Sequence, residues 1–269
     1  MSNERKDYKS LFEGRFTKSN KNLKLGFFKK IYYHLSPSTY TERILYEYID
    51  HIFKLHGCRP LKILDVGCGG GNDRLNIYGN VTGVDVSEKS ISNAKDIYPD
   101  AQIIDISQGL PFPENNFDMI YCSEVVGHID QADKDSVFAE MRRVLKPGGF
   151  IAMSIETEGI NWLTKKLKRR GLYQELWIDS WGHIGLESPS ETLSRVGKYF
   201  LISDHRPTST YIFQADILAG MDKLSGYLGL LNKQNWIRVI NLLLALPFLL
   251  SMLIYKDGQI NNIVLTGRK

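Results

Sequence analysis

The residues best suited to chemistry are glycines that follow a short apolar run, in the segment KILDVGCGGG at residues 62–71. Gly67, Gly69 and Gly71 carry no side chains, so the backbone N–H groups of this loop can approach a ligand closely. Asp65 places a carboxylate near the end of the same run. Loops of this kind follow a strand and bind the polar part of a nucleotide-type cofactor.

A second acid lies where another strand is expected to end. The segment VTGVDV at residues 81–86 reads as a buried strand, and Asp85 follows Gly67 by 18 positions. In nucleotide-binding sheets, a carboxylate at this place accepts hydrogen bonds from the vicinal hydroxyls of a ribose. Ser87 follows as a predicted helix cap. We therefore predict that Asp85 binds a ribose and is not merely a turn-forming residue.

The spacing of the glycines distinguishes two classes of cofactor. A dinucleotide fingerprint, G-x-G-x-x-G, would require glycine at position 72 when counted from Gly67. That position is Asn72. A nicotinamide-dependent oxidoreductase is therefore disfavoured, although it remains the alternative from another enzyme class.

The elements that must position these residues alternate along the chain. We predict a helix over 41–55, and then strands over 62–66, 81–86, 101–106, 117–121 and 150–155, with helices over 87–98 and 137–145. Two further strands are predicted over 199–205 and 262–266. This order indicates an α/β, Rossmann-like doubly wound sheet, mostly parallel with an antiparallel last strand, that gathers ligands at the carboxyl ends of its strands.

Five segments in this order resemble the small-molecule branch of the class I S-adenosylmethionine (SAM) dependent methyltransferases: ILDVGCGGG, GVDVS, AQIID, LPFPENNFDMIYCSEVVGHI and MRRVLKPGGFIAMSI. That branch includes enzymes that methylate quinone precursors, sterols, phospholipid headgroups and sugars. The resemblance extends over about residues 40–205. One departure is the helix after the glycine loop, at residues 73–78, which is about one turn shorter than usual.

The resemblance implies SAM as the cofactor and assigns it a set of residues. The methionine part would lie against Asp65, Gly67, Cys68 and Gly69, with Ser123 at the methionine end. Asp85 would bind the ribose hydroxyls. Val86 would pack on adenine, and Asp105 and Ile106 would contact the adenine amino group and ring. The protein's main task in methyl transfer is alignment and exclusion of water, and a base is needed only if the acceptor must lose a proton.

Four side chains near the predicted carboxyl edge are candidates for that base: Glu124, His128, Glu156 and His183. For His128 an equally good interpretation is a helix-start residue that bonds to the backbone. His183 is slightly better placed on the side of the acceptor.

Other sequence features argue against a nucleic-acid acceptor, a cysteine metal site and secretion. Nucleic-acid adenine methylases carry Asn or Asp, two prolines and an aromatic residue after the fourth strand, whereas residues 121–124 read YCSE, so a nucleic-acid acceptor is disfavoured. Cys58, Cys68 and Cys122 have no paired spacing, which implies no metal site and indicates a reducing, cytoplasmic setting. The first residues lack the apolar core of a secretory signal.

The expected organisation is a basic arm over 1–40, a SAM-binding core over 41–206, a helical apolar insertion over 207–258 and the last strand over 259–269. Residues 63–158 carry 7 Lys and Arg against 16 Asp and Glu, so the predicted core is acidic although the net charge of the whole chain is +4.

The uncharged run at 239–255 is at the short limit for a membrane span and contains Pro247. Since the strands predicted before and after this run belong to one sheet, a membrane span is excluded unless residues 211–231 form a weaker return leg.

We predict that this run lies in the interface of an anionic membrane, helped by the KKLKRR cluster at 165–170, or serves as a lid or as a homodimer contact. The sequence thus favours a cytoplasmic methyltransferase that acts on a small-molecule, lipid or lipid-linked acceptor. A SAM-binding regulatory subunit without catalysis is the non-enzymatic alternative.

Overall fold

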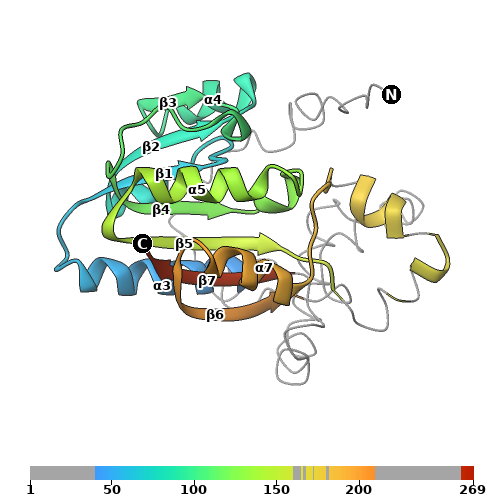
Figure 1. The fold of residues 1–269 in the computed structure, drawn as a ribbon. Helices are drawn as coiled ribbons and strands as arrows, with labels where there is room; N and C mark the ends of the chain where they lie inside the picture. Colours follow the sequence, from blue (N-terminus) through green and yellow to red (C-terminus); the bar gives the residue numbers. More distant parts are fainter. Residues whose placement is uncertain (1–39, 160–164, 166–167, 172, 180–181, 210–261) are drawn as a thin grey trace, which may run out of the picture.

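A computed structural model describes residues 40–159, 165, 168–171, 173–179, 182–209 and 262–269. A seven-stranded sheet in the order β3-β2-β1-β4-β5-β7-β6 forms the centre (Figure 1). The strands are β1 Leu61–Val66, β2 Gly79–Asp85, β3 Asp100–Ile103, β4 Phe117–Ser123, β5 Leu145–Glu156, β6 Leu201–Ser209 and β7 Asn262–Arg268. The α-helices are α3 Tyr40–Leu55, α4 Glu88–Ala94, α5 Lys134–Val144 and α7 Pro189–Gly197.

Strands β1 to β5 pair in parallel, and β7 lies antiparallel between β5 and β6. This confirms the predicted α/β class and the antiparallel last strand. The carboxyl ends of β1, β2, β4 and β5 therefore meet along one edge of the sheet, where ligands of doubly wound sheets bind.

Alternate residues of the central strands supply two separate cores. On β4, Met119 and Tyr121 pack in the layer that includes α3 and α4, whereas Ile120 and Cys122 pack in the layer that includes α5 and α7. This alternation follows from the two-residue period of a strand covered on both faces. The result is a three-layer arrangement with helices on both sides of the sheet (Figure 1).

Several predicted boundaries were wrong. Helix α4 ends at Ala94 and not at 98, and α5 begins at Lys134 and not at 137. Strand β3 ends at Ile103 and not at 106, because the Asp105 carboxylate accepts the Ser107 N–H at 3.0 Å and begins a short 3-10 helix, η3 Ile106–Gln108. Strand β5 begins at Leu145 and not at 150, so residues 146–149 belong to the strand. The register between β4 and β5 shifts at this point, which accommodates the additional residues.

The helix after the glycine loop is a short 3-10 helix, η2 Asp73–Ile77, as its predicted length requires. Strand β6 continues to Ser209, three residues beyond the predicted end of the core at 206. The basic arm over 1–39 and most of the predicted insertion, with the apolar run at 239–255, lie outside the described residues.

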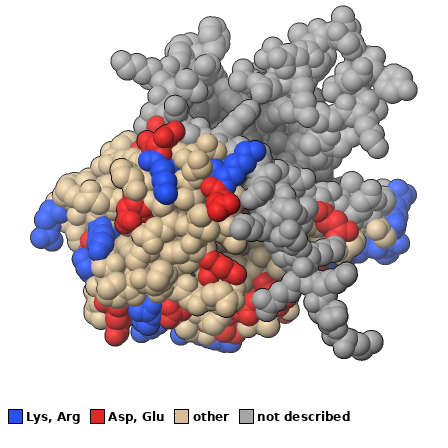
Figure 2. Space-filling model, turned by 90° about the horizontal axis from the view of Figure 1, so that it is seen from above, with Lys and Arg blue, Asp and Glu red and all other residues tan. Residues whose placement is uncertain are grey.

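Among the helices of the described part, none combines the length and apolarity that a membrane crossing needs. Basic and acidic side chains are interspersed over the described surface seen in Figure 2, so the acidic balance of the core produces no patch of one sign on that face.

Candidate functional site

The glycine loop follows β1 directly and uses conformations that favour glycine. Gly67, Gly69 and Gly71 have φ angles of 68°, 52° and 84°. A Cβ on Gly67 would lie 2.2 Å from Cγ2 of Val125, so the close packing of this loop also requires glycine there. The sequence thus selects a loop whose backbone is free of side chains at the carboxyl edge of the sheet.

Asp85 ties this loop to the next helix. Its Oδ2 accepts the Gly69 N–H at 2.9 Å, and its Oδ1 accepts the Ser87 N–H at 2.8 Å. Burial raises the pKa of Asp85, although the two backbone donors oppose this effect. Each carboxylate oxygen has two acceptor directions, so the side chain can still accept from vicinal hydroxyls. The position fits the ribose-binding role predicted for Asp85.

Asp65 lies buried beneath the loop and is only 2% exposed. Its Oδ2 is 3.0 Å from the Tyr98 hydroxyl, which also accepts the Asn72 N–H at 2.7 Å. Burial raises the pKa of Asp65 to about 7, against the opposing hydrogen bond from Tyr98. Asp65 and Tyr98 therefore support the loop from below. Asp65 was identified from the sequence as a residue of the cofactor site, whereas Tyr98 was not.

The other predicted cofactor residues surround this loop. Val86 is 36% exposed just after β2, so its side chain is accessible to a ligand at this edge of the sheet. Asp105 and Ile106 lie at the start of η3, and Ser123 ends β4. The Cys68 side chain is buried against the backbone of β2 near Gly83, so contact of Cys68 with a cofactor would come from its backbone.

The four candidate bases lie together at the ends of β4 and β5. His128 belongs to the short 3-10 helix η4 Val126–His128, Glu156 ends β5, and His183 follows the π-helix η5 Gln174–Asp179. The two imidazole rings stack with centroids 4.8 Å apart. Oε1 of Glu156 lies 3.6 Å from Nε2 of His128 and 4.0 Å from Nε2 of His183. Residues far apart in sequence thus form one polar cluster.

Glu124 borders this cluster in a strained backbone conformation, with a φ of 59°. Its Oε1 accepts from Ser154 Oγ at 3.1 Å and from Asn262 Nδ2 at 2.8 Å, which links β4, β5 and β7. The side chain is reachable by solvent, but the protein around it desolvates the carboxylate. This desolvation and the nearby Glu156 carboxylate raise the pKa of Glu124.

Burial separates the four candidates. Glu156 is 4% exposed and His183 is 3% exposed, whereas Glu124 and, to a lesser extent, His128 reach solvent. A base must come within hydrogen-bond reach of its acceptor. His183, favoured from the sequence, is therefore the less accessible of the two histidines.

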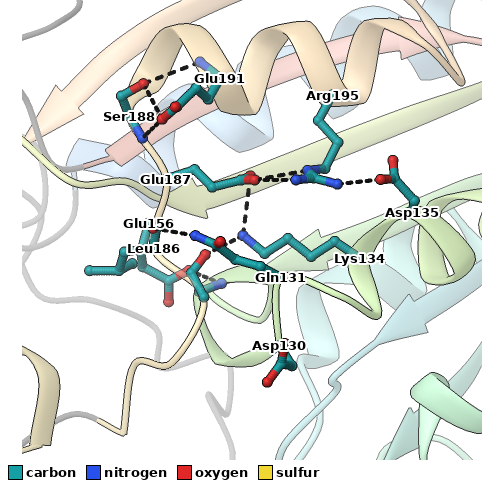
Figure 3. Close-up of polar contacts among 12 residues, drawn as sticks. Asp130, Gln131, Lys134, Asp135, Glu156, Leu186, Glu187, Ser188, Glu191 and Arg195 are labelled. Atoms are coloured by element: carbon teal, nitrogen blue, oxygen red, sulfur yellow. Dashed lines mark hydrogen bonds and ion pairs between the residues drawn. The ribbon is translucent and has the colours of Figure 1, made fainter.

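A buried ionic network fixes the segment that carries His183. Lys134 reaches from α5 to the carbonyl oxygen of Gly185 and to Glu187 Oε2, which is 3.3 Å away, while Arg195 of α7 approaches Glu187 Oε1 through two nitrogens (Figure 3). Lys134 is 1% exposed. The backbone N–H of Gly185 also donates to Gly127 O at 3.2 Å. These contacts hold the segment after η5 against η4.

A family model described as a methyltransferase domain matches residues 64–153, the part of the chain from the glycine loop to β5. The 2-methyl-6-phytyl-1,4-hydroquinone methyltransferase of Synechocystis is 28% identical over 193 residues, which is 65% of this chain and 56% of that protein. The sterol 24-C-methyltransferase ERG6B of Gibberella zeae is 36% identical over 110 residues, which is 36% of this chain and 28% of that protein. The chain thus spans from about a quarter to just over half of the length of these relatives.

A solved structure with a similar fold is a putative sarcosine dimethylglycine methyltransferase from Galdieria sulphuraria. It has a TM-score of 0.57 at 17% identity and covers 89% of this chain and 97% of its own. The methyltransferase domain model thus matches the part of the chain that carries the glycine loop and Asp85, and the chain is similar to class I, S-adenosylmethionine-dependent small-molecule methyltransferases, among them quinone and sterol methyltransferases.

Proposed function

We propose that this protein binds SAM at the carboxyl ends of β1 and β2 and transfers its methyl group to a small-molecule acceptor. The observation that carries the proposal is the link between the glycine loop and Asp85, whose carboxylate accepts the Gly69 N–H at 2.9 Å. This link joins a side-chain-free loop to the acid that ends the neighbouring strand. The bound cofactor would supply an electrophilic methyl carbon on a sulfonium sulfur, open to in-line displacement.

The residues of the chain would bind and align the reactants. Asp85 would accept from the ribose, Val86 would pack on adenine, and the loop of Gly67 and Gly69 would leave room for the methionine part. Asp105 and Ile106 would border the adenine, while Ser123 would lie at the methionine end. Such alignment accounts for much of the rate enhancement in a displacement between two bound reactants.

If the acceptor is a hydroxyl or an activated carbon, Glu124 is the proposed base. It is the most accessible of the four candidates, and its raised pKa suits proton uptake near neutral pH. Both side-chain hydrogen bonds of Glu124 to the described residues use Oε1, so Oε2 is the atom proposed to take the proton. Glu156 and His183 lie deeper and would hold the surroundings of Glu124.

Replacing Glu124 with glutamine is expected to lower turnover by roughly 100-fold to 10,000-fold, the usual contribution of a general base. Affinity for S-adenosylhomocysteine should stay unchanged, because the amide oxygen of the new side chain can accept the hydrogen bonds that join β4 to β5 and β7. Turnover is measured as formation of S-adenosylhomocysteine with hydroquinone, catechol and sterol acceptors. Full activity of E124Q would remove Glu124 from the mechanism.

The class of acceptor is proposed to be a lipid or a lipid-linked small molecule. Supporting this, the names of two relatives specify a phytylated hydroquinone and a sterol. The apolar run at 239–255 and the basic cluster at 165–170 suit contact with an anionic membrane. A cytoplasmic setting and attachment to the membrane surface are part of the same proposal, and a lid or a homodimer contact is the alternative role of the run.

Replacing residues 239–255 with a short Gly-Ser bridge is expected to release the protein from anionic liposomes without loss of S-adenosylhomocysteine binding. Flotation of parent and variant, with neutral liposomes as the control, measures the effect. A parent that never floats, or a variant that still floats, contradicts the interfacial role. A change in mass by light scattering would assign the run to a homodimer.

A regulatory subunit would bind the cofactor but show no turnover. The proposed activity is therefore tested by adding labelled SAM and the acceptor panel to the parent and to E124Q. Label in an acceptor with the parent supports catalysis. Binding of S-adenosylhomocysteine without transfer to any acceptor favours the regulatory alternative.

A further inference from the structure

His128, Glu156 and His183 bring together three groups of the kind that bind transition metal ions. They come from η4, the end of β5 and the segment after η5, and their nearest donor atoms all lie within 4.8 Å of one another. No local sequence motif joins them, because each lies 27 or more positions from the next along the chain. The spacing of the cysteines, from which no metal site was predicted, gives no sign of this cluster.

The protein orients the His128 ring for such a role. Nδ1 of His128 lies 3.1 Å from the carbonyl oxygen of Gly182, which can only accept, so this nitrogen carries a proton. Nε2 then faces Oε1 of Glu156. Metal-binding histidines nearly always donate their second N–H to a carbonyl or a carboxylate in this way.

The Glu156 carboxylate is held in the matching orientation. Its Oε2 accepts the backbone N–H of Gly127 at 3.4 Å, while Oε1 faces both imidazole rings. A Cβ on Gly127 would lie 3.1 Å from Oε2 of Glu156 and 3.2 Å from Cδ2 of His183. Glycine at this position therefore leaves room for the side chains of Glu156 and His183.

The distances suit one shared ion after a small adjustment. Two donor atoms that each lie about 2.1 Å from an ion can be at most about 4.2 Å apart. The separations of 3.6 Å and 4.0 Å from Glu156 Oε1 meet this limit. The three donor atoms together span up to 4.8 Å, so the most distant pair must move closer by several tenths of an ångström. The stacked rings, at 24° to each other, need a modest rotation to direct both nitrogens to one point.

Charge also favours a cation here. Glu124, just after β4, and Glu156, at the end of β5, place two carboxylates at this edge of the sheet. Lys134, the buried cation nearby, is paired with Glu187. His128 and His183 face the Glu156 carboxylate and can balance its charge when protonated. A divalent ion between the rings would take the place of those protons in a region where an uncompensated charge is costly.

We propose that His128, Glu156 and His183 bind one divalent transition metal ion of the Zn²⁺ and Fe²⁺ type. Two imidazoles and one carboxylate favour such ions over Mg²⁺ or Ca²⁺, which prefer sets of oxygen ligands. Three protein ligands leave a position open for water or for an oxygen atom of a second molecule. The site does not depend on the proposed methyltransferase activity.

The test uses the full, untagged protein after treatment with a chelator and dialysis. Calorimetric titration with Zn²⁺ should give one site per chain. Glu156→Gln, His128→Ala and His183→Ala should each weaken binding by more than about 100-fold, since even changes behind the ligands cost about 10-fold to 100-fold. His51→Ala on the exposed surface of α3 is the matched control and should bind as the parent does.

Substitution with Co²⁺ provides a second readout that needs no variant. We expect visible absorption bands of a nitrogen and oxygen site, without the charge-transfer band of a thiolate. A thiolate band would place the ion on a cysteine and overturn the proposal. It is also overturned if the parent binds no Zn²⁺, or if the three variants bind it as tightly as His51→Ala does.

Retained S-adenosylhomocysteine binding and an unchanged circular dichroism spectrum verify that each variant is folded. Loss of Zn²⁺ binding in a variant that passes both checks supports the site. Because Zn²⁺ binding and S-adenosylhomocysteine binding are measured separately, failure of the metal site is distinguishable from failure of the proposed function.

Discussion

Replacing Asp85 with alanine is expected to weaken binding of S-adenosylhomocysteine by at least about 100-fold. The change removes the acceptor of the Gly69 and Ser87 N–H groups as well as the proposed acceptor of the ribose hydroxyls. Hydrogen bonds to a charged group contribute about 1.5–3 kcal/mol each. Loss of the two bonds proposed from the ribose hydroxyls therefore corresponds to a factor of about 100 or more in affinity. Isothermal titration calorimetry of parent and variant measures the effect.

The matched control is Asp96→Ala, which removes the same charge from the exposed end of the segment after α4. Its affinity should stay within a factor of about two of the parent, as expected for a surface change away from the site. Equal affinity of the Asp85 and Asp96 variants would contradict the role assigned to the end of β2.

Replacing Glu187 with alanine is expected to destabilise the fold by about 3–5 kcal/mol, the cost of breaking a buried ion pair from one side. Lys134 would remain buried without its counter-ion, and its pKa is already lowered by burial. Arg195 would lose two hydrogen bonds, of 2.9 Å and 2.6 Å, although its pairing with Asp135 remains. Urea denaturation followed by circular dichroism measures the free energy of unfolding.

Glu191→Ala is the control for this variant, because it removes a carboxylate from the exposed start of α7, four residues away (Figure 3). The loss of its capping bonds to Ser188 should cost only about 1 kcal/mol. A Glu187 variant no less stable than this control would show that Lys134 and Arg195 do not depend on Glu187.

The sheet and the glycine loop were predictable because their signals are local. Consecutive apolar residues in 63–66 and 150–155 indicate strands covered on both faces, and the structure buries both. The acid that ends β2 and the serine that caps α4 are neighbours in sequence, so their joint role could be read directly.

The supports of the site were not predictable, because they depend on contacts between distant residues. Tyr98 lies 33 positions from Asp65, and its hydroxyl looks like part of an apolar helix face until the loop folds over it. The ends of η4 and β5 and the segment after η5 meet only once the sheet is complete. The strand boundaries at 103 and 145 depend on a side-chain cap and on a register shift, which apolar patterning does not reveal.

The most direct test of the central claim is calorimetric titration of the purified protein with S-adenosylhomocysteine and, separately, with NAD. We predict one S-adenosylhomocysteine site per chain and no binding of NAD, because the loop carries Asn72 where a dinucleotide fingerprint requires glycine. Binding of NAD without binding of S-adenosylhomocysteine would contradict the assignment of the loop, and with it the proposed methyl transfer.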